Sequence, residues 1–310
     1  MLRDHRRQPV IEVSGLSKSY GRIRAVDAVD LNVLEGEIFG LIGPNGAGKT
    51  TTMECIEGLR APDAGRISIL ALDPRRDRVA LLNRIGVQLQ EAQLQKRITV
   101  REAVGLWSSL YDRPLDGHQL LAQLGIAGKA GARFMTLSGG QKQRLFIALA
   151  LINDPEVVFL DELTTGLDPQ ARRAIWDLIR GIRDRGKTVF LTTHLMEEAE
   201  KLCDRVAIID HGRIVDADSP AALVQRHCPE RTLLIATDDD GAVEALGRVS
   251  GIEQASRDGA NVMLEARSID VMTPVIRCLA ERQIVVTDFR TIVPTLEDVF
   301  LKLTGHSVRQ

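Results

Sequence analysis

Residues 43–50 have the types and spacing that phosphate binding requires. Their sequence, Gly-Pro-Asn-Gly-Ala-Gly-Lys-Thr, matches the pattern GxxxxGK(S/T) and follows an apolar run that predicts a strand. The glycines let the backbone curl so that several N–H groups face one anion, and the helix expected from Lys49 onward adds its positive end. Lys49 supplies a full positive charge, and the Thr50 hydroxyl suits Mg²⁺, which prefers oxygen ligands. The predicted ATP-binding residues of this loop are Gly43, Pro44, Asn45, Gly46, Ala47, Gly48, Lys49, Thr50 and Thr51.

Two acids follow the apolar run 157–160, where a strand is expected to end. The carboxyl ends of parallel strands form the crevice in which α/β sheets hold ligands. We expect Asp161 to hold Mg²⁺ through water, and Glu162 to orient or deprotonate the water that attacks the γ-phosphate. An Asp-Glu pair alone is usually a solvated turn, but the phosphate loop upstream favours the catalytic interpretation.

A histidine closes a second apolar run of the same kind. Residues 189–192 predict a strand, and His194 lies just beyond it. A lone histidine at such a place is more often a structural hydrogen-bonding group than a catalytic one. Because His194 is expected at the end of a neighbouring strand, the sequence also predicts a contact with the γ-phosphate.

These residues need a sheet to position them, and strands alternate with helices between residues 10 and 220. Several strand candidates are short continuous apolar runs, as in strands covered on both faces. The strand candidates are residues 10–13, 38–42, 67–69, 157–160, 189–192 and 206–210, and the helix candidates are 49–57, 141–151, 169–185 and 196–203. The alternation predicts an α/β fold with a mixed, largely parallel sheet, interrupted by a helical subdomain over about 91–140.

A second pattern follows an expected linker at residues 221–231. Residues 232–310 predict a small α+β accessory domain with the order βαββαβ, which is a ferredoxin-like arrangement. We expect Thr295 to cap the last helix together with Asp298, and Gly305 to end it.

The overall composition excludes some classes of function. The 310 residues carry a formal net charge of only -2, whereas a nucleic-acid partner usually requires a basic face. The four cysteines lie far apart, so no disulfide or zinc framework is expected. The sequence contains neither an apolar signal segment nor a run of about 18 apolar residues, so no membrane span is expected.

Residues 137–141, with the sequence Leu-Ser-Gly-Gly-Gln, add a motif of a different kind. Small residues, a serine hydroxyl and backbone N–H groups at a helix start suit a second phosphate site. An N-capped helix would explain Ser138 but not the whole run. The run resembles the signature motif of ABC-transporter ATPase domains, and the resemblance covers residues 10–218 with the motifs in the expected order.

This resemblance implies roles for further residues. Tyr20 matches the aromatic residue that stacks on adenine, and Asp168 matches the D-loop aspartate. Gln90 matches the glutamine that touches Mg²⁺ and the attacking water, although Gln88 is an alternative. His194 matches the switch histidine. The family often has proline where Leu163 follows the glutamate, but this change removes no catalytic group. The catalytic set is therefore Glu162, His194 and Gln90, and the metal set is Thr50, Gln90 and Asp161.

The resemblance also implies an assembly. Two ABC ATPase domains sandwich two ATP molecules head to tail, so one chain with one set of motifs implies a homodimer. The signature residues that would complete the partner's site are Ser138, Gly139, Gly140 and Gln141. Residues 296–305, 53–59 and 85–90 resemble ATPase subunits of ABC-2-type exporters of the daunorubicin-resistance-like multidrug group. That resemblance implies a separately encoded transmembrane permease and a peripheral location on the cytoplasmic face of the cell membrane.

Two other functions are compatible with the ATPase motifs. The first is a soluble ABC ATPase that acts on ribosomes or DNA, which the single ATPase domain and near-neutral charge disfavour. The second is a regulatory or degenerate ATPase, which the complete set of expected catalytic residues disfavours.

Overall fold

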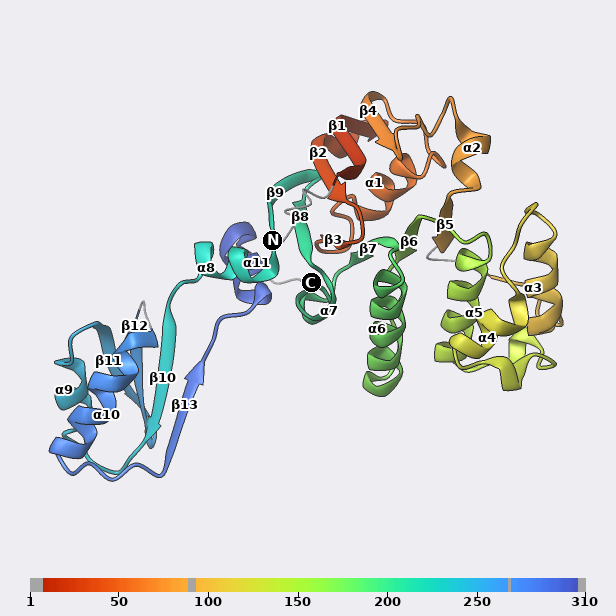
Figure 1. Ribbon diagram of the computed structural model, residues 1–310. Helices are drawn as coiled ribbons and strands as arrows, with labels where there is room; N and C mark the ends of the chain where they lie inside the picture. The colour runs from red at the N-terminus through yellow and green to blue at the C-terminus, as the bar shows by residue number, and fades with distance from the viewer. Residues whose placement is uncertain (1–7, 89–92, 267–268, 306–310) are drawn as a thin grey trace, which may run out of the picture. The chain divides into compact units, whose positions relative to one another are not determined.

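The computed structural model describes residues 8–88, 93–266 and 269–305, and its elements are labelled in Figure 1. The chain divides into two compact units, of which the first ends at Pro220 and the second begins at Ala221. No helix within these described ranges is long and apolar enough to cross a membrane.

The first unit is organised around a sheet of the order β5-β6-β7-β3-β8-β9, in which only the β8–β9 pair is antiparallel. Every residue of β3, β6 and β7 is buried, because helices and a second sheet cover both faces. The predicted mixed, largely parallel sheet is therefore confirmed. Its strands are β3 (Ile38–Ile42), β5 (Ile85–Gln88), β6 (Val157–Asp161), β7 (Thr188–Thr193), β8 (Arg205–Asp210) and β9 (Arg213–Asp218).

A separate antiparallel sheet of the order β2-β1-β4 covers one side of this unit. Its strands are β1 (Pro9–Tyr20), β2 (Ile23–Leu34) and β4 (Ala64–Ile69). The apolar runs 10–13 and 67–69 are strands, as predicted, but they belong to this antiparallel sheet and not to the largely parallel one. Helix α1 (Lys49–Ile56) contacts strands of both sheets, and one hydrophobic core that includes Ile11, Ile56 and Phe159 joins them.

The remaining helices of the first unit cover the parallel sheet or form the helical subdomain. Helices α3, α4 and α5 contact one another, and Figure 1 shows them side by side. The predicted helical interruption is thus present, with short 3-10 turns at Ala127–Lys129 and Phe134–Thr136. The helices are α2 (Arg78–Leu82), α3 (Val100–Ser108), α4 (Gly117–Gln123), α5 (Gly139–Leu151), α6 (Pro169–Asp184) and α7 (Met196–Leu202).

The second unit contains a four-stranded antiparallel sheet of the order β11-β12-β10-β13. With two helices inserted in the chain order βαββαβ, this is the predicted ferredoxin-like arrangement. Apolar residues such as Leu233, Leu264 and Val275 form its core. Its elements are β10 (Arg231–Ala236), α9 (Ala242–Gly247), β11 (Ile252–Asp258), β12 (Asn261–Ala266), a 3-10 turn (Ile269–Val271), α10 (Met272–Glu281) and β13 (Asp288–Ile292).

Two helices flank this sheet in the sequence. The segment 221–231, expected as a linker, is mostly helical instead, because α8 (Pro220–His227) covers much of it and buries Leu223 and Val224. Helix α11 (Leu296–Thr304) begins after Thr295, whose N–H and hydroxyl both donate to Asp298. It ends at Gly305, which has a φ of 77°. Both predicted ends of α11 are confirmed.

Candidate functional site

Three adjacent strands of the parallel sheet carry the predicted chemistry at their carboxyl ends. The strands β6, β7 and β3 are neighbours in that order, and they are parallel. Asp161 and Glu162 lie at the end of β6, His194 follows β7, and the phosphate loop follows β3. The sheet therefore brings together groups that are more than 100 positions apart in the sequence, at the edge where ligands bind in such folds.

The phosphate loop uses glycine where the backbone conformation, and at Gly48 also the space, disfavours a side chain. Gly46 and Gly48 have φ values of 81° and 104°, a region that favours glycine. A Cβ atom on Gly48 would also lie 2.3 Å from the Ala25 carbonyl oxygen. The Lys49 ammonium turns back and donates to the carbonyl oxygens of Gly43 and Pro44, at 3.0 Å each. The Lys49 side chain therefore lies against the loop backbone, beside the position that a bound phosphate would occupy.

Lys49 is almost completely buried and has an acidic partner. Its Nζ atom lies 3.3 Å from Oε1 of Glu162, whose side chain is also buried. Burial lowers the pKa of Lys49, and the nearby Glu162 carboxylate acts in the opposite direction. The ion pair connects the end of β6 to the phosphate loop.

The Asp161 carboxylate has two hydroxyl partners. Burial raises the pKa of Asp161, whereas hydrogen bonds from the Thr192 and Thr50 hydroxyls lower it. Carboxylate and hydroxyl oxygens are the ligands that a hard divalent cation prefers. Asp161 and Thr50, which the sequence assigns to Mg²⁺, therefore lie in direct contact.

Glu162 and His194 also meet at this edge. The His194 Nδ1 atom lies 3.5 Å from Glu162 Oε1. Glu162 has a φ of 45°, which is uncommon for a residue other than glycine, and its N–H donates to the Thr192 carbonyl and hydroxyl oxygens at 3.2 Å. Thr192 therefore contacts both Asp161 and Glu162. The sequence analysis did not identify this residue, and only its position two residues before His194 could have suggested it.

Gln90, the predicted glutamine ligand, lies outside the described residues. The alternative, Gln88, is the last residue of β5 and is buried, and its side-chain oxygen accepts a hydrogen bond from the Asp161 N–H at 3.2 Å. Gln88 is therefore a buried residue that holds the backbone at Asp161, the carboxylate to which the sequence assigns Mg²⁺.

Tyr20, the predicted adenine-stacking residue, lies at the end of β1 and is 41% exposed. The Arg60 guanidinium is centred 5.2 Å from its ring centroid, and the Lys18 ammonium lies at 5.9 Å. Both distances allow cation–π attraction, which holds the ring without burying it.

The signature residues lie at a different place on the first unit. The Ser138 hydroxyl accepts from the Gln141 N–H at 3.4 Å, and the Gln141 side chain accepts from the Ser138 N–H at 3.1 Å, which together cap α5. Asp168 caps α6 by accepting from the Ala171 N–H at 2.9 Å. Residues 138–141 and Asp168 line one hollow of about 410 Å³ that includes no phosphate-loop residue. One chain therefore does not bring its own signature and phosphate loop together.

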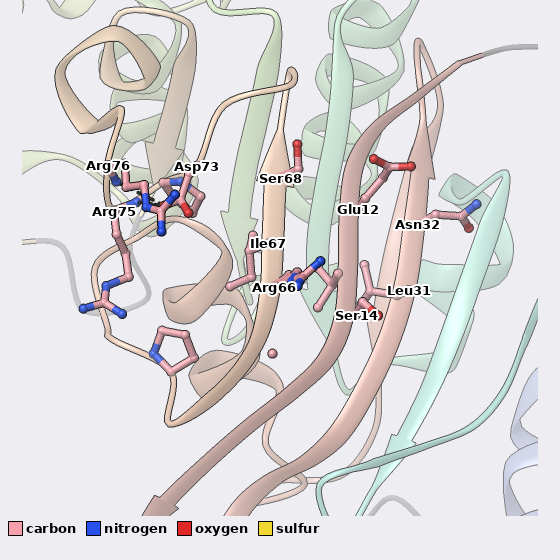
Figure 2. Close-up of a pocket in the computed structure, with 14 residues that line it drawn as sticks. Glu12, Ser14, Leu31, Asn32, Arg66, Ile67, Ser68, Asp73, Arg75 and Arg76 are labelled. Carbon is pink, nitrogen blue, oxygen red and sulfur yellow. Dashed lines mark hydrogen bonds between the residues drawn. The ribbon is translucent and has the colours of Figure 1, made fainter.

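A larger hollow of about 1070 Å³ lies over the antiparallel sheet, and Figure 2 shows its lining. Arg66 projects from β4, whereas Arg75 and Arg76 come from the loop that follows, near Asp73. None of the residues that the sequence assigns to nucleotide binding or catalysis lines it, so this hollow is separate from the three strand ends.

Comparisons with known proteins agree with this geometry. Residues 26–165 match the family model described as ABC transporter. The chain is 40% identical to the Nod factor export ATP-binding protein I of Paraburkholderia xenovorans (strain LB400), over 97% of this chain and 99% of that protein. It is 39% identical to the protein of the same name from Rhizobium meliloti (strain 1021), over 96% of this chain and 89% of that protein.

Solved structures give the same result for the fold. An ATP-binding subunit of an ABC transporter is similar at a TM-score of 0.63 and 27% identity, over 70% of this chain and 92% of that one. A dimeric ATP-binding cassette in a post-hydrolysis state, bound to ADP and Pi, has a TM-score of 0.61 and 28% identity, over 67% of this chain and 98% of that one. With the phosphate loop and the acids at adjacent strand ends, these likenesses show that the chain belongs to the ABC-transporter family, as an ATP-binding protein with ATPase activity.

Proposed function

We propose that the chain hydrolyses ATP at the edge formed by β6, β7 and β3. The observation that carries the proposal is the contact of Lys49 and His194 with the same Glu162 oxygen, at 3.3 Å and 3.5 Å. In the proposed roles, Lys49 binds the β- and γ-phosphates, and Glu162 orients or deprotonates the attacking water. His194 contacts the γ-phosphate.

We infer that Mg²⁺ accompanies the nucleotide. Thr50 and Asp161 supply the oxygen ligands and are hydrogen-bonded to each other at the loop, which fits a small hard cation. Bound there, Mg²⁺ would neutralise charge on the β- and γ-phosphate oxygens. Gln90, by resemblance, is the third proposed ligand.

We further propose that two copies of the chain complete each ATP site. The signature residues Ser138–Gln141 line a hollow separate from the phosphate loop, so they are available to a second subunit. The dimeric solved cassette bound to ADP and Pi supports this assembly. In the proposed homodimer, Ser138 and Gly140 of one subunit contact the nucleotide held by Lys49 of the other.

The proposed physiological role is export. The relatives from Paraburkholderia xenovorans and Rhizobium meliloti are named as export ATP-binding proteins and match nearly the whole chain, including the ferredoxin-like unit. We propose that this chain is likewise the ATP-hydrolysing subunit of an ABC-2-type exporter. It would act at the cytoplasmic face of the membrane, bound to a separately encoded permease, and would need no nucleic-acid partner.

Co-expression with a candidate permease tests this role. A polytopic protein encoded beside this chain should co-purify with it from detergent extracts, and the complex should hydrolyse ATP in vesicles. Nucleic acid should not stimulate the ATPase. If the purified chain hydrolysed ATP but bound no such permease, and responded to RNA or ribosomes instead, the export role would be refuted while the ATPase would stand.

A further inference from the structure

Glu198, on α7, is an acid that the roles proposed above do not use. Its side chain is only 3% exposed. Its Oε1 atom accepts a hydrogen bond from the Thr164 hydroxyl at 2.7 Å and another from the Trp176 indole N–H at 3.0 Å. Thr164 and Trp176 are also buried, so all three groups lie out of contact with solvent.

A buried polar group needs hydrogen-bond partners, because removing it from water is costly when its bonds are not replaced. The 2.7 Å separation between the Thr164 hydroxyl and Glu198 is the usual length of a well-formed hydrogen bond between oxygens. Glu198 therefore fixes the position of Thr164 firmly. Thr164 is two residues beyond Glu162 in the turn that leaves β6.

The same turn is held at a second point. The Glu162 N–H donates to the Thr192 carbonyl and hydroxyl oxygens, and Thr192 is two residues before His194. Hydrogen bonds at two points thus connect the segments 162–164 and 192–198. The Glu162–His194 contact lies between these two points. The distance of 3.5 Å between the two side chains therefore depends on both sets of hydrogen bonds.

We propose that Glu198 is a positioning residue for ATP hydrolysis. Through Thr164 it holds the turn that carries Glu162 against the segment that carries His194, and it does not contact nucleotide. The inference rests on the roles proposed for Glu162 and His194. It predicts that breaking the Glu198–Thr164 bond lowers kcat far more than it weakens nucleotide binding, because Lys49, which is proposed to bind the β- and γ-phosphates, lies in neither segment.

Thr164→Val in the full chain tests this directly, since valine keeps the shape of threonine and removes the donor. We expect kcat to fall on the order of 10-fold to 100-fold, the cost of a small misplacement of catalytic groups. The Kd for ATP and the KM should stay within about twofold, because only the reacting geometry changes. Thr164→Ser, which restores the hydroxyl, should recover most of the kcat.

Trp176→Phe is the matched control, because it removes the other donor to the same Glu198 oxygen but lies on α6, outside the segments 162–164 and 192–198. It should lower Tm about as much as Thr164→Val and leave kcat within about threefold. If both variants lowered kcat in proportion to their loss of Tm, or if Thr164→Val acted on KM alone, Glu198 would be merely structural and the inference overturned.

Glu198→Gln is a second variant, which keeps the shape and an acceptor oxygen but weakens both bonds. It should show a smaller fall in kcat with unchanged Kd, so the test stands even if Thr164→Val fails to fold. Glu162→Gln, measured alongside, separates the two proposals. If Glu162→Gln abolished turnover while Thr164→Val and Glu198→Gln kept normal kcat, only the positioning role would fail. If Glu162→Gln kept turnover, both would fail.

Discussion

The Lys49 ammonium lies 3.3 Å from the Glu162 carboxylate, and both side chains are buried. The group proposed to bind phosphate and the group proposed to activate water are therefore direct partners. In the proposed mechanism a γ-phosphate, which carries more negative charge than one carboxylate, competes with Glu162 for Lys49. This competition links ATP binding to the chemical step.

Lys49→Ala should weaken ATP binding by about 10-fold to 100-fold, since a hydrogen bond to a charged group contributes about 1.5–3 kcal/mol. Isothermal titration calorimetry with ATP measures this directly. Lys187→Ala is the control, because Lys187 pairs with Asp154 and lies outside the proposed site. A Lys49→Ala variant with the wild-type affinity for ATP would refute the proposed phosphate contact.

Glu162→Gln should reduce turnover by about 10²-fold to 10⁴-fold, the usual contribution of a general base, while ATP binding is retained. The ATP-bound variant should then elute as a dimer in size-exclusion chromatography. Glu156→Gln, before the opposite end of β6, provides the control, because Glu156 forms an exposed ion pair with Arg84. Normal turnover in Glu162→Gln would remove this residue from the base role.

Gly140→Ala should fold normally and lose turnover. Its new Cβ would lie 3.4 Å from the Ala171 Cβ, an ordinary contact within the chain, but it would obstruct a phosphate approaching from the partner subunit. We expect a fall of about tenfold or more, which corresponds to about 1.4 kcal/mol of lost transition-state stabilisation. Steady-state ATPase assays and thermal melts measure the two effects.

The control for Gly140→Ala is Gly181→Ala in α6, where the added Cβ would meet only the Arg185 side chain, at 3.7 Å. Equal turnover in both variants would argue against phosphate contact at Gly140. An equal loss of Tm in both would show that the helix, rather than the interface, responds to the substitution.

Glu57→Gln should remove a pH-dependent loss of stability. Glu57 is 5% exposed, and burial, with Asp161 and Glu54 nearby, raises its pKa well above the usual 4.5. The unfolded chain releases this proton above about pH 4.5 while the folded chain keeps it, so folding stability falls as pH rises from there to the folded pKa. Thermal melts at a series of pH values above about 4.5 should show Glu57→Gln gaining in Tm over the wild type as the pH rises.

Glu244→Gln is the control for this prediction, because Glu244 is an exposed partner of Arg248 on α9. Its Tm difference from the wild type should stay nearly constant over the same pH range. If the Glu57→Gln difference were equally constant, Glu57 would share the protonation state of the unfolded chain and the prediction would be wrong.

Strands β3, β6 and β7 of the parallel sheet are predictable because strands buried on both faces leave unbroken apolar runs. The edge strands β5 and β9 of the same sheet are not among the predicted strands. Strand β2 leaves no such signal. Its pairing with β1 contains several register shifts, so Val26, Val29 and Val33 are buried without a strict period of two. The sequence reasoning therefore missed a strand of 12 residues.

The site shows the same division. The phosphate loop and the acids are predictable because their chemistry fixes residue type at fixed spacing. Thr192 and Glu198 are not, since a supporting hydrogen bond requires only that two residues meet in space. Gln88 illustrates the intermediate case, in which the sequence offers two glutamines two positions apart and only the fold shows that Gln88 contacts Asp161.

The hydrogen bond that caps α5 affects which further hydrogen bonds the Ser138 hydroxyl can make. A serine hydroxyl has one hydrogen to donate and lone pairs to accept with. In capping α5, Ser138 uses a lone pair toward Gln141, and this leaves its hydrogen to be donated elsewhere. In the proposed homodimer, Ser138 would therefore keep a hydrogen to donate to an anion held by the second subunit, while its lone pair continues to cap α5.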